Sequence, residues 1–130
     1  MIKKWLVHGT TVLWALTILV LTSIPRLQPP DLGIHFTDKL AHAGVYGIFA
    51  FFLIRSFRYS RRFQTRAAQA TCVSAVLFAA LDEWHQYYIP GRFAEVADFL
   101  ADCLGIGLVL IVYFLWKRNQ KKHNAKGHDV

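Results

Sequence analysis

The chain has 130 residues, of which 55% are hydrophobic and 18% are charged. Its length fits one domain, and this balance favours a membrane rather than water as the solvent. The 15 basic residues outnumber the 8 acids, which could indicate nucleic-acid binding. They lie, however, between apolar runs and near the ends of the chain, where anionic lipid headgroups and the positive-inside bias account for them. Since no aromatic-basic motif of the kind that binds RNA or DNA is present, we expect no nucleic-acid partner.

Four apolar runs divide the chain. The first, residues 5–24, is 20 residues long, enough to cross a hydrocarbon core of ~30 Å at ~1.5 Å per residue. A cleaved signal peptide would have a shorter apolar region followed by small residues, so we expect this helix to be retained. The second and third runs are shorter, and the fourth carries two aspartates. With their polar ends included, the sequence predicts helices over about residues 5–24, 38–54, 67–86 and 95–116.

The predicted fold is therefore an all-α, polytopic membrane protein, a bundle of four transmembrane helices with both termini in the cytoplasm. This topology puts twelve of the 15 basic residues inside, as the positive-inside bias requires. The three on the outer side are Arg26, Lys39 and Arg92. Every acid except Asp129 then lies on the outer side or in the outer half of a helix. Residues 1–116 form the predicted membrane domain, and residues 117–130 form a basic cytoplasmic tail that we expect to be disordered.

Polar residues are concentrated in residues 81–107, around the last two predicted helices. Asp98 and Asp102 stand four residues apart inside the fourth apolar run. A charge in such a run costs a few kcal/mol or more, so it usually faces a bundle interior or a cavity. Pro90-Gly91 predicts a tight turn that would pack the third and fourth helices antiparallel. That packing would bring the carboxylates, a histidine and Arg92 together at one membrane depth.

Helical spacing groups further polar side chains on common faces. Asp82, His85 and Gln86 follow an i, i+3, i+4 spacing at the end of the third predicted helix, with Glu83 beside them. A second set, spaced four residues apart on the second predicted helix, consists of Asp38, His42 and Tyr46. Both sets fall on the side of the membrane that the charge bias assigns to the exterior.

These groups suit three kinds of chemistry. Carboxylates and a histidine can exchange protons with a bound group, and the candidate catalytic residues are His42, Asp82, Glu83, His85, Gln86 and Asp98. Arginine binds phosphate bidentately and lysine binds it as a point charge, and the candidate substrate-binding residues are Lys39, Tyr46, Arg92 and Asp102. A divalent cation with oxygen ligands is the third alternative, with Asp82, Glu83, Asp98 and Asp102 as its ligands. The sequence identifies no cofactor, because no spacing matches a zinc or EF-hand pattern.

A purely structural interpretation stays open beside these three. The same residues could form an internal network of ion pairs and hydrogen bonds, for example between Arg92 and Asp98, that only joins the helices. The number of costly groups on one side favours a functional site.

The order of these motifs resembles the VanZ-like family of small bacterial integral membrane proteins. The resemblance is carried by Asp38-Lys39-x-x-His42-x-x-x-Tyr46, Asp82-Glu83-x-x-Gln86, Pro90-Gly91-Arg92 and Asp98-x-x-x-Asp102-x-x-Gly105. The family often has asparagine where Asp102 stands, and the additional carboxylate here would either raise the pKa of a neighbouring group or favour a bound cation.

The resemblance implies a multi-pass protein of the bacterial inner membrane, with membrane lipids as partners. The family's namesake is associated with resistance to the glycopeptide antibiotic teicoplanin, and the family has been suggested to process lipid headgroups. We expect an outward-facing polar site that binds or modifies a phosphate-bearing lipid headgroup or an envelope lipid carrier. Whether the protein is an enzyme stays open, since a non-catalytic protein could shield surface lipids or contribute to teicoplanin-type resistance. A proton- or ion-conducting subunit ranks last, because no broken helix pair or inverted repeat is visible.

Overall fold

The computed structural model describes residues 2–25 and 37–126. Within these ranges the chain forms four α-helices and one short 3-10 helix, without a strand. The elements are α1 (Ile2–Ser23), α2 (Thr37–Tyr59), η1 (Gln64–Arg66), α3 (Ala67–Gln86) and α4 (Val96–Lys126). The all-α prediction is confirmed. Most of the loop expected after the first helix, and the last four residues of the predicted tail, lie outside the described residues.

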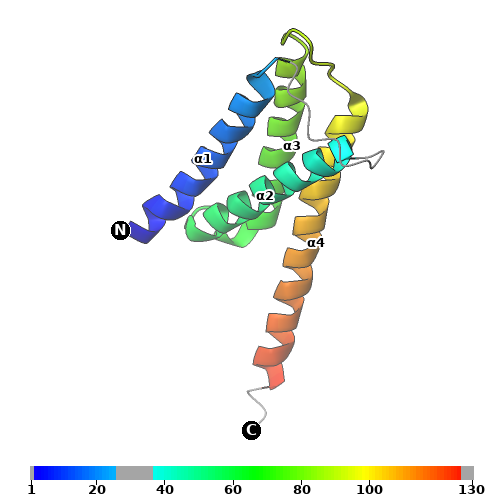
Figure 1. The fold of residues 1–130 in the computed structure, drawn as a ribbon. Coiled ribbons are helices and arrows are strands. Elements are labelled where there is room, and N and C mark those ends of the chain that lie inside the picture. Colours follow the sequence, from blue (N-terminus) through cyan, green and yellow to red (C-terminus); the bar gives the residue numbers. More distant parts are fainter. Residues whose placement is uncertain (1, 26–36, 127–130) are drawn as a thin grey trace.

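The helices alternate in direction so that the start of α1 and the end of α4 lie on the same side (Figure 1). In that view α1 and α3 rise, α4 descends after the turn that follows α3, and α2 crosses obliquely between them. The turn uses Pro90 and Gly91, as predicted: the amide of Arg92 donates to the carbonyl oxygen of Ile89 at 3.1 Å, and Gly91 has φ of 79°. This positive φ is the reason a glycine follows the proline in a type II turn.

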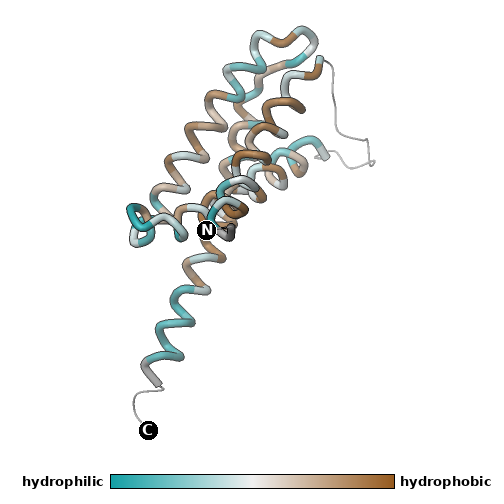
Figure 2. The backbone as a smooth tube through the Cα atoms, turned by 90° about the vertical axis from the view of Figure 1, so that its left-hand side faces the viewer, coloured by the Kyte–Doolittle hydropathy of each residue, from teal (hydrophilic) through white to brown (hydrophobic). Residues whose placement is uncertain are grey.

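Three of the four helices are long and apolar enough to cross a membrane, judged by length and composition. They are Lys4–Ser23, Thr37–Tyr59 and Val96–Asn124. α3 is not among them; it is rich in small residues and carries Asp82 and Glu83 in its last turns. Figure 2 shows apolar residues along the bundle and polar residues in the segment after α2 and in the last turns of α4.

Two helices are longer than the apolar runs that predict them. α2 continues through the arginines after residue 54 to Tyr59, and α4 continues from 116 to Lys126, through part of the tail that we expected to be disordered. Arginine, lysine and glutamine are good helix formers, so the end of an apolar run does not end the backbone hydrogen-bond ladder. The end of an apolar run therefore predicts the end of the lipid-facing part of a helix better than the end of the helix.

α2 and α4 make the most extensive helix pair of the fold, and they meet backbone to backbone at Gly105. A Cβ placed on Gly105 would overlap the carbonyl oxygen of Ala43. A Cβ on Gly47 would lie 3.4 Å from the carbonyl oxygen of Gly105. Small residues permit such close approach between helices in a membrane. Gly44, one turn from Gly47 on α2, makes no such contact, because nothing lies within 4 Å of a Cβ there.

Replacing Gly105 with alanine should therefore separate α2 from α4. We expect Gly105→Ala to lower the free energy of unfolding by more than the ~1–3 kcal/mol typical of overpacking, because the clash is with backbone atoms rather than with a movable side chain. Thermal unfolding of the purified protein in detergent measures this effect.

Gly44→Ala is the matched control on the same helix pair. It should leave the melting temperature unchanged or raise it, since alanine exceeds glycine in helix propensity by ~1 kcal/mol. Equal destabilisation by both substitutions would contradict the assignment of the contact to Gly105.

Candidate functional site

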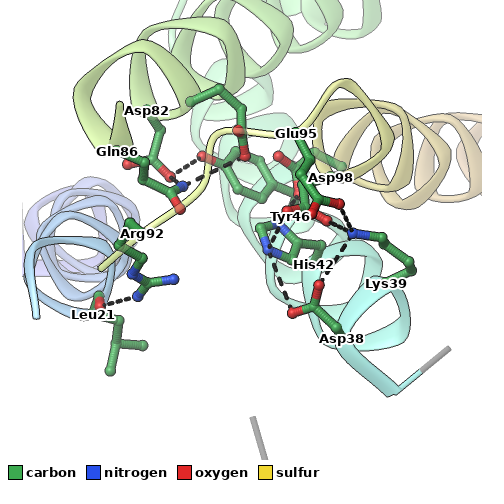
Figure 3. A network of polar contacts seen from close by, with 12 residues as sticks. Leu21, Asp38, Lys39, His42, Tyr46, Asp82, Gln86, Arg92, Glu95 and Asp98 are labelled. Carbon is green, nitrogen blue, oxygen red and sulfur yellow. Dashed lines mark hydrogen bonds and ion pairs between the residues drawn. The ribbon is translucent and has the colours of Figure 1, made fainter. Parts of the chain in front are cut away.

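Polar side chains of α2, α3 and α4 meet where α3 ends and where α2 and α4 begin (Figure 3). Thr22, near the end of α1, joins them through a hydrogen bond to Asp82. Asp38 and Asp98 each lie in the first turn of their helix, where the positive end of the helix dipole stabilises a carboxylate. The crossing of α2 and α4 then brings these first turns together. We call the connected set of side chains at this end the polar network. Its members are Thr22, Asp38, Lys39, His42, Tyr46, Asp82, Glu83, Gln86, Glu95, Asp98 and Asp102.

Lys39 joins α2 to α4 through three carboxylates. Its Nζ donates to Asp98, to Glu95 at 2.9 Å and to Asp38 at 3.1 Å. An ammonium group has three donors, so this lysine already has as many partners as donors. The sequence proposed Lys39 as a phosphate ligand; the structure places it as the counter-ion of the network.

His42 lies among carboxylates of α2 and α4. Its Nδ1 is 3.0 Å from a carboxylate oxygen of Asp102, which is 1% exposed. Its Nε2 lies 3.8 Å from Asp98 and 4.0 Å from Asp38. Each ring nitrogen therefore faces an acid, the arrangement that a proton-transfer group or a metal ligand uses.

Asp82 is the most fully partnered acid of the network. It is 2% exposed, and it accepts hydrogen bonds from Thr22 at 2.7 Å, Tyr46 at 2.9 Å and Gln86 at 3.3 Å. These donors come from α1, α2 and α3. Three donors stabilise a buried carboxylate. The main role of Asp82 is therefore to join α1, α2 and α3 by hydrogen bonds.

Glu83 has an incompletely satisfied carboxylate. One oxygen is 3.5 Å from Nε2 of Gln86, while Oε2 is buried and has no hydrogen-bond partner among the described residues. One of its carboxylate oxygens, a ring nitrogen of His42 and a carboxylate oxygen of Asp102 all lie within 4.8 Å of one another. Glu83 therefore connects the Asp82 side of the network to the His42 side.

Two predicted site residues stand apart from this network. Arg92 donates from Nη2 to the carbonyl oxygen of Leu21 at 2.6 Å, and Figure 3 shows its guanidinium directed towards Leu21 rather than Asp98. The pairing of Arg92 with Asp98 is not formed, because Lys39 occupies that carboxylate. His85 is half-buried, and its Nδ1 has no hydrogen-bond partner within the described ranges. The histidine of the network is thus His42 from α2, not His85 from α3.

Sequence reasoning left out two members of the network. Thr22 lies within the first apolar run, and its hydroxyl donates to Asp82. Glu95 stands at the start of the last predicted helix, and it accepts from Lys39. A hydroxyl near the end of a membrane helix is a usable signal, since such groups often bond across helices.

The described structure also has a groove of about 660 Å³ between α2 and α4, away from the polar network. Its lining includes Phe51, Ile54, Arg58, Val112 and Trp116. The guanidinium of Arg58 lies 4.7 Å from the centre of the Trp116 ring, a cation–π distance. This groove lies towards the basic ends of the helices, so it is not part of the site formed by the acids.

Fold and site together define a small, all-helical membrane protein with a buried network of acids at one end. The sequence matches the VanZ/LLP1 family over residues 4–117, and the chain belongs to that family. The match includes α2, α3, most of α1 and α4, and every member of the polar network. Comparisons with curated proteins and with solved structures returned no match.

Removing the Tyr46 hydroxyl tests the junction at Asp82. We expect Tyr46→Phe to lower the free energy of unfolding by ~1.5–3 kcal/mol, the contribution of a hydrogen bond to a charged group. Thermal unfolding in detergent measures the change. Tyr87→Phe, at an exposed tyrosine of the turn, is the control and should change stability by less than ~0.5 kcal/mol. Similar melting temperatures for the two variants would contradict a stabilising role of the Tyr46–Asp82 bond.

Proposed function

We propose that this protein is a four-span protein of the bacterial inner membrane, with α3 as the fourth span. The support is the outer face of α3. Its exposed residues Val73, Leu77, Leu81 and Trp84 are each more than half exposed and follow one another at helical spacing. A continuous apolar stripe of this kind suits contact with lipid, while the small residues on the opposite face pack inside the bundle.

In this proposal both termini are cytoplasmic and the polar network faces outwards. Twelve of the 15 basic residues occupy the helix ends away from the network: the start of α1, the segment from the end of α2 through η1, and the last turns of α4. The positive-inside bias puts such ends in the cytoplasm. The network then lies at the depth of the outer-leaflet headgroups.

The proposed function is to bind a phosphate-bearing lipid headgroup or an envelope lipid carrier. If the protein is an enzyme, it also modifies the lipid that it binds. The observation that carries it is the placement of His42 between Asp98 and Asp102 beside the unsatisfied carboxylate of Glu83. These groups can accept and donate protons at a bound headgroup. Arg92, at the same end of the bundle, would contact phosphate at the rim. Lys39 would orient the carboxylates rather than bind phosphate itself.

A non-catalytic role in shielding surface lipids, including a contribution to teicoplanin-type resistance, is the second candidate. The three hydrogen bonds that Asp82 accepts favour this non-catalytic role. A network that only supports a binding surface needs its polar groups to be hydrogen-bonded, and it needs no free base. The two candidates differ in turnover: both require headgroup binding, and only the first changes the lipid.

Cysteine labelling tests the topology. In a background without Cys72 and Cys103, we expect Tyr88→Cys to react with a membrane-impermeant maleimide in intact spheroplasts. Arg61→Cys, in the segment between α2 and α3, should react only after permeabilisation, because twelve basic residues hold that side in the cytoplasm. The opposite pattern, or equal labelling of both positions, would contradict the outward orientation.

A lipid-binding assay tests the function. Purified protein in nanodiscs should bind a polyprenyl phosphate and should not bind the polyprenol of equal length. We expect His42→Gln to weaken this binding by about tenfold or more, the equivalent of losing one charge-assisted hydrogen bond. His123→Gln, an exposed histidine near the far end of α4, should bind like the wild type.

Lipid analysis of cells then separates the two candidates. If the protein is an enzyme, a deletion strain should show an altered phosphate-bearing envelope lipid that wild-type and His123→Gln genes restore and His42→Gln does not. Phosphate-dependent binding with unchanged lipids would favour the shielding role. Equal affinity for the phosphate and the alcohol would overturn both.

A further inference from the structure

We infer that His42, Glu83 and Asp102 form a binding site for one divalent transition-metal ion. The three residues come from α2, α3 and α4, and they offer ligand atoms that lie within 4.8 Å of one another. The ion's role in capturing phosphate rests on the proposed function, whereas ion binding itself does not.

Glu83 points to a ligand independently of the clustering of acids. It is 8% exposed, and its Oε2 has no hydrogen-bond partner among the described residues. A buried carboxylate oxygen without a partner is costly. One oxygen of the Glu83 carboxylate lies within 4.8 Å of a ring nitrogen of His42 and of a carboxylate oxygen of Asp102. A cation is the species that would satisfy all three.

The distance between His42 and Asp102 suits a shared ion. Two ligand atoms bound at about 2.1 Å and at right angles lie about 3 Å apart, and His42 Nδ1 is 3.0 Å from the Asp102 oxygen. If Nδ1 binds the ion, Nε2 carries the proton and faces Asp98 at 3.8 Å. Metal-binding histidines commonly direct their second N–H towards a carboxylate, which fixes the ring. Asp98 would be a positioning residue in this site.

The neighbouring acids are less suited to hold the ion. Asp82 already accepts three hydrogen bonds, which leaves it little capacity for a metal. Asp38, His42 and Asp98 form a second compact group, but the ammonium of Lys39 contacts both of its carboxylates and would repel a cation. The structure therefore replaces the ligand set suggested by the sequence with one that includes His42 and excludes Asp82 and Asp98.

Charge balance gives a reason for an ion at this place. The polar network gathers six carboxylates around one lysine and one histidine. The carboxylates are Asp38, Asp82, Glu83, Glu95, Asp98 and Asp102. This excess of negative charge would repel a phosphate, and Lys39 has no donor left to offset it. A divalent ion bound by Glu83 and Asp102 would neutralise both and present a positive centre.

The ligands also indicate the class of ion. Imidazole favours zinc, iron and copper, while carboxylates also suit manganese, magnesium and calcium. One imidazole with two carboxylates is therefore best matched by Zn²⁺ or Mn²⁺. Three protein ligands leave at least one coordination position open, where a phosphate oxygen of the headgroup would bind.

Direct ion binding tests the site. Chelator-treated full-length protein without a polyhistidine tag would be titrated with Zn²⁺ and with Mn²⁺ in detergent, and the bound metal counted by mass spectrometry. We expect about one tightly bound ion per chain. Glu83→Gln and Asp102→Asn should weaken binding by more than the ~10–100-fold that loss of an outer-shell partner causes. Size-exclusion profiles and circular dichroism verify that each variant is folded; Glu83→Gln is nearly isosteric and removes no hydrogen bond from Oε2.

Glu95→Gln is the matched control, because Glu95 belongs to the same acid cluster but contacts Lys39 rather than the proposed ion site. It should retain the stoichiometry and affinity of the wild type. Wild-type affinity in Glu83→Gln and Asp102→Asn, or equal loss in Glu95→Gln, would overturn the site. Saturable ion binding without any selectivity for polyprenyl phosphate would support the ion site and overturn the proposed function, so the two can fail separately.

Discussion

The contact between Gly105 and Ala43 determines how this protein is assembled. At this point the backbones of α2 and α4 lie too close for any side chain on Gly105. His42 is the neighbour of Ala43, and Asp102 lies about one helical turn before Gly105. The closest approach of the two helices therefore lies directly beside the 3.0 Å contact between His42 and Asp102. A helix pair held further apart would separate the half-buried His42 from the buried Asp102.

The polar network has a rigid part and an unsatisfied part. Around Asp82, donors from α1, α2 and α3 complete the coordination of a buried carboxylate, and this fixes the ends of three helices. Around Glu83, one oxygen lacks a partner and two further ligand atoms are near. A low-dielectric environment strengthens the effect of each part: the satisfied Asp82 carboxylate stabilises the fold, and the unsatisfied Glu83 oxygen favours binding of a ligand.

The proposed ion site accounts for phosphate binding at the proposed headgroup site. A phosphate alone would meet six acids and a lysine whose donors are already used, so the network by itself favours a cation over an anion. An ion at His42, Glu83 and Asp102 reverses the local charge and adds an open coordination position. Asp98 and Lys39 then act outside the ligand shell, where they fix the orientation of His42.

The sequence by itself determined the four helices, the turn at Pro90-Gly91, the family, and the burial of Asp98 and Asp102, because these follow from local spacing and from the cost of charge in an apolar run. It could not determine which groups pair. Lys39, rather than Arg92, reaches Asp98, and Thr22 reaches Asp82 across 60 positions of the chain. Spacing within one helix fixes which residues share a face, but partners on different helices depend on the crossing and depth of those helices. The close packing at Gly105 decides both, and only the tertiary structure contains it.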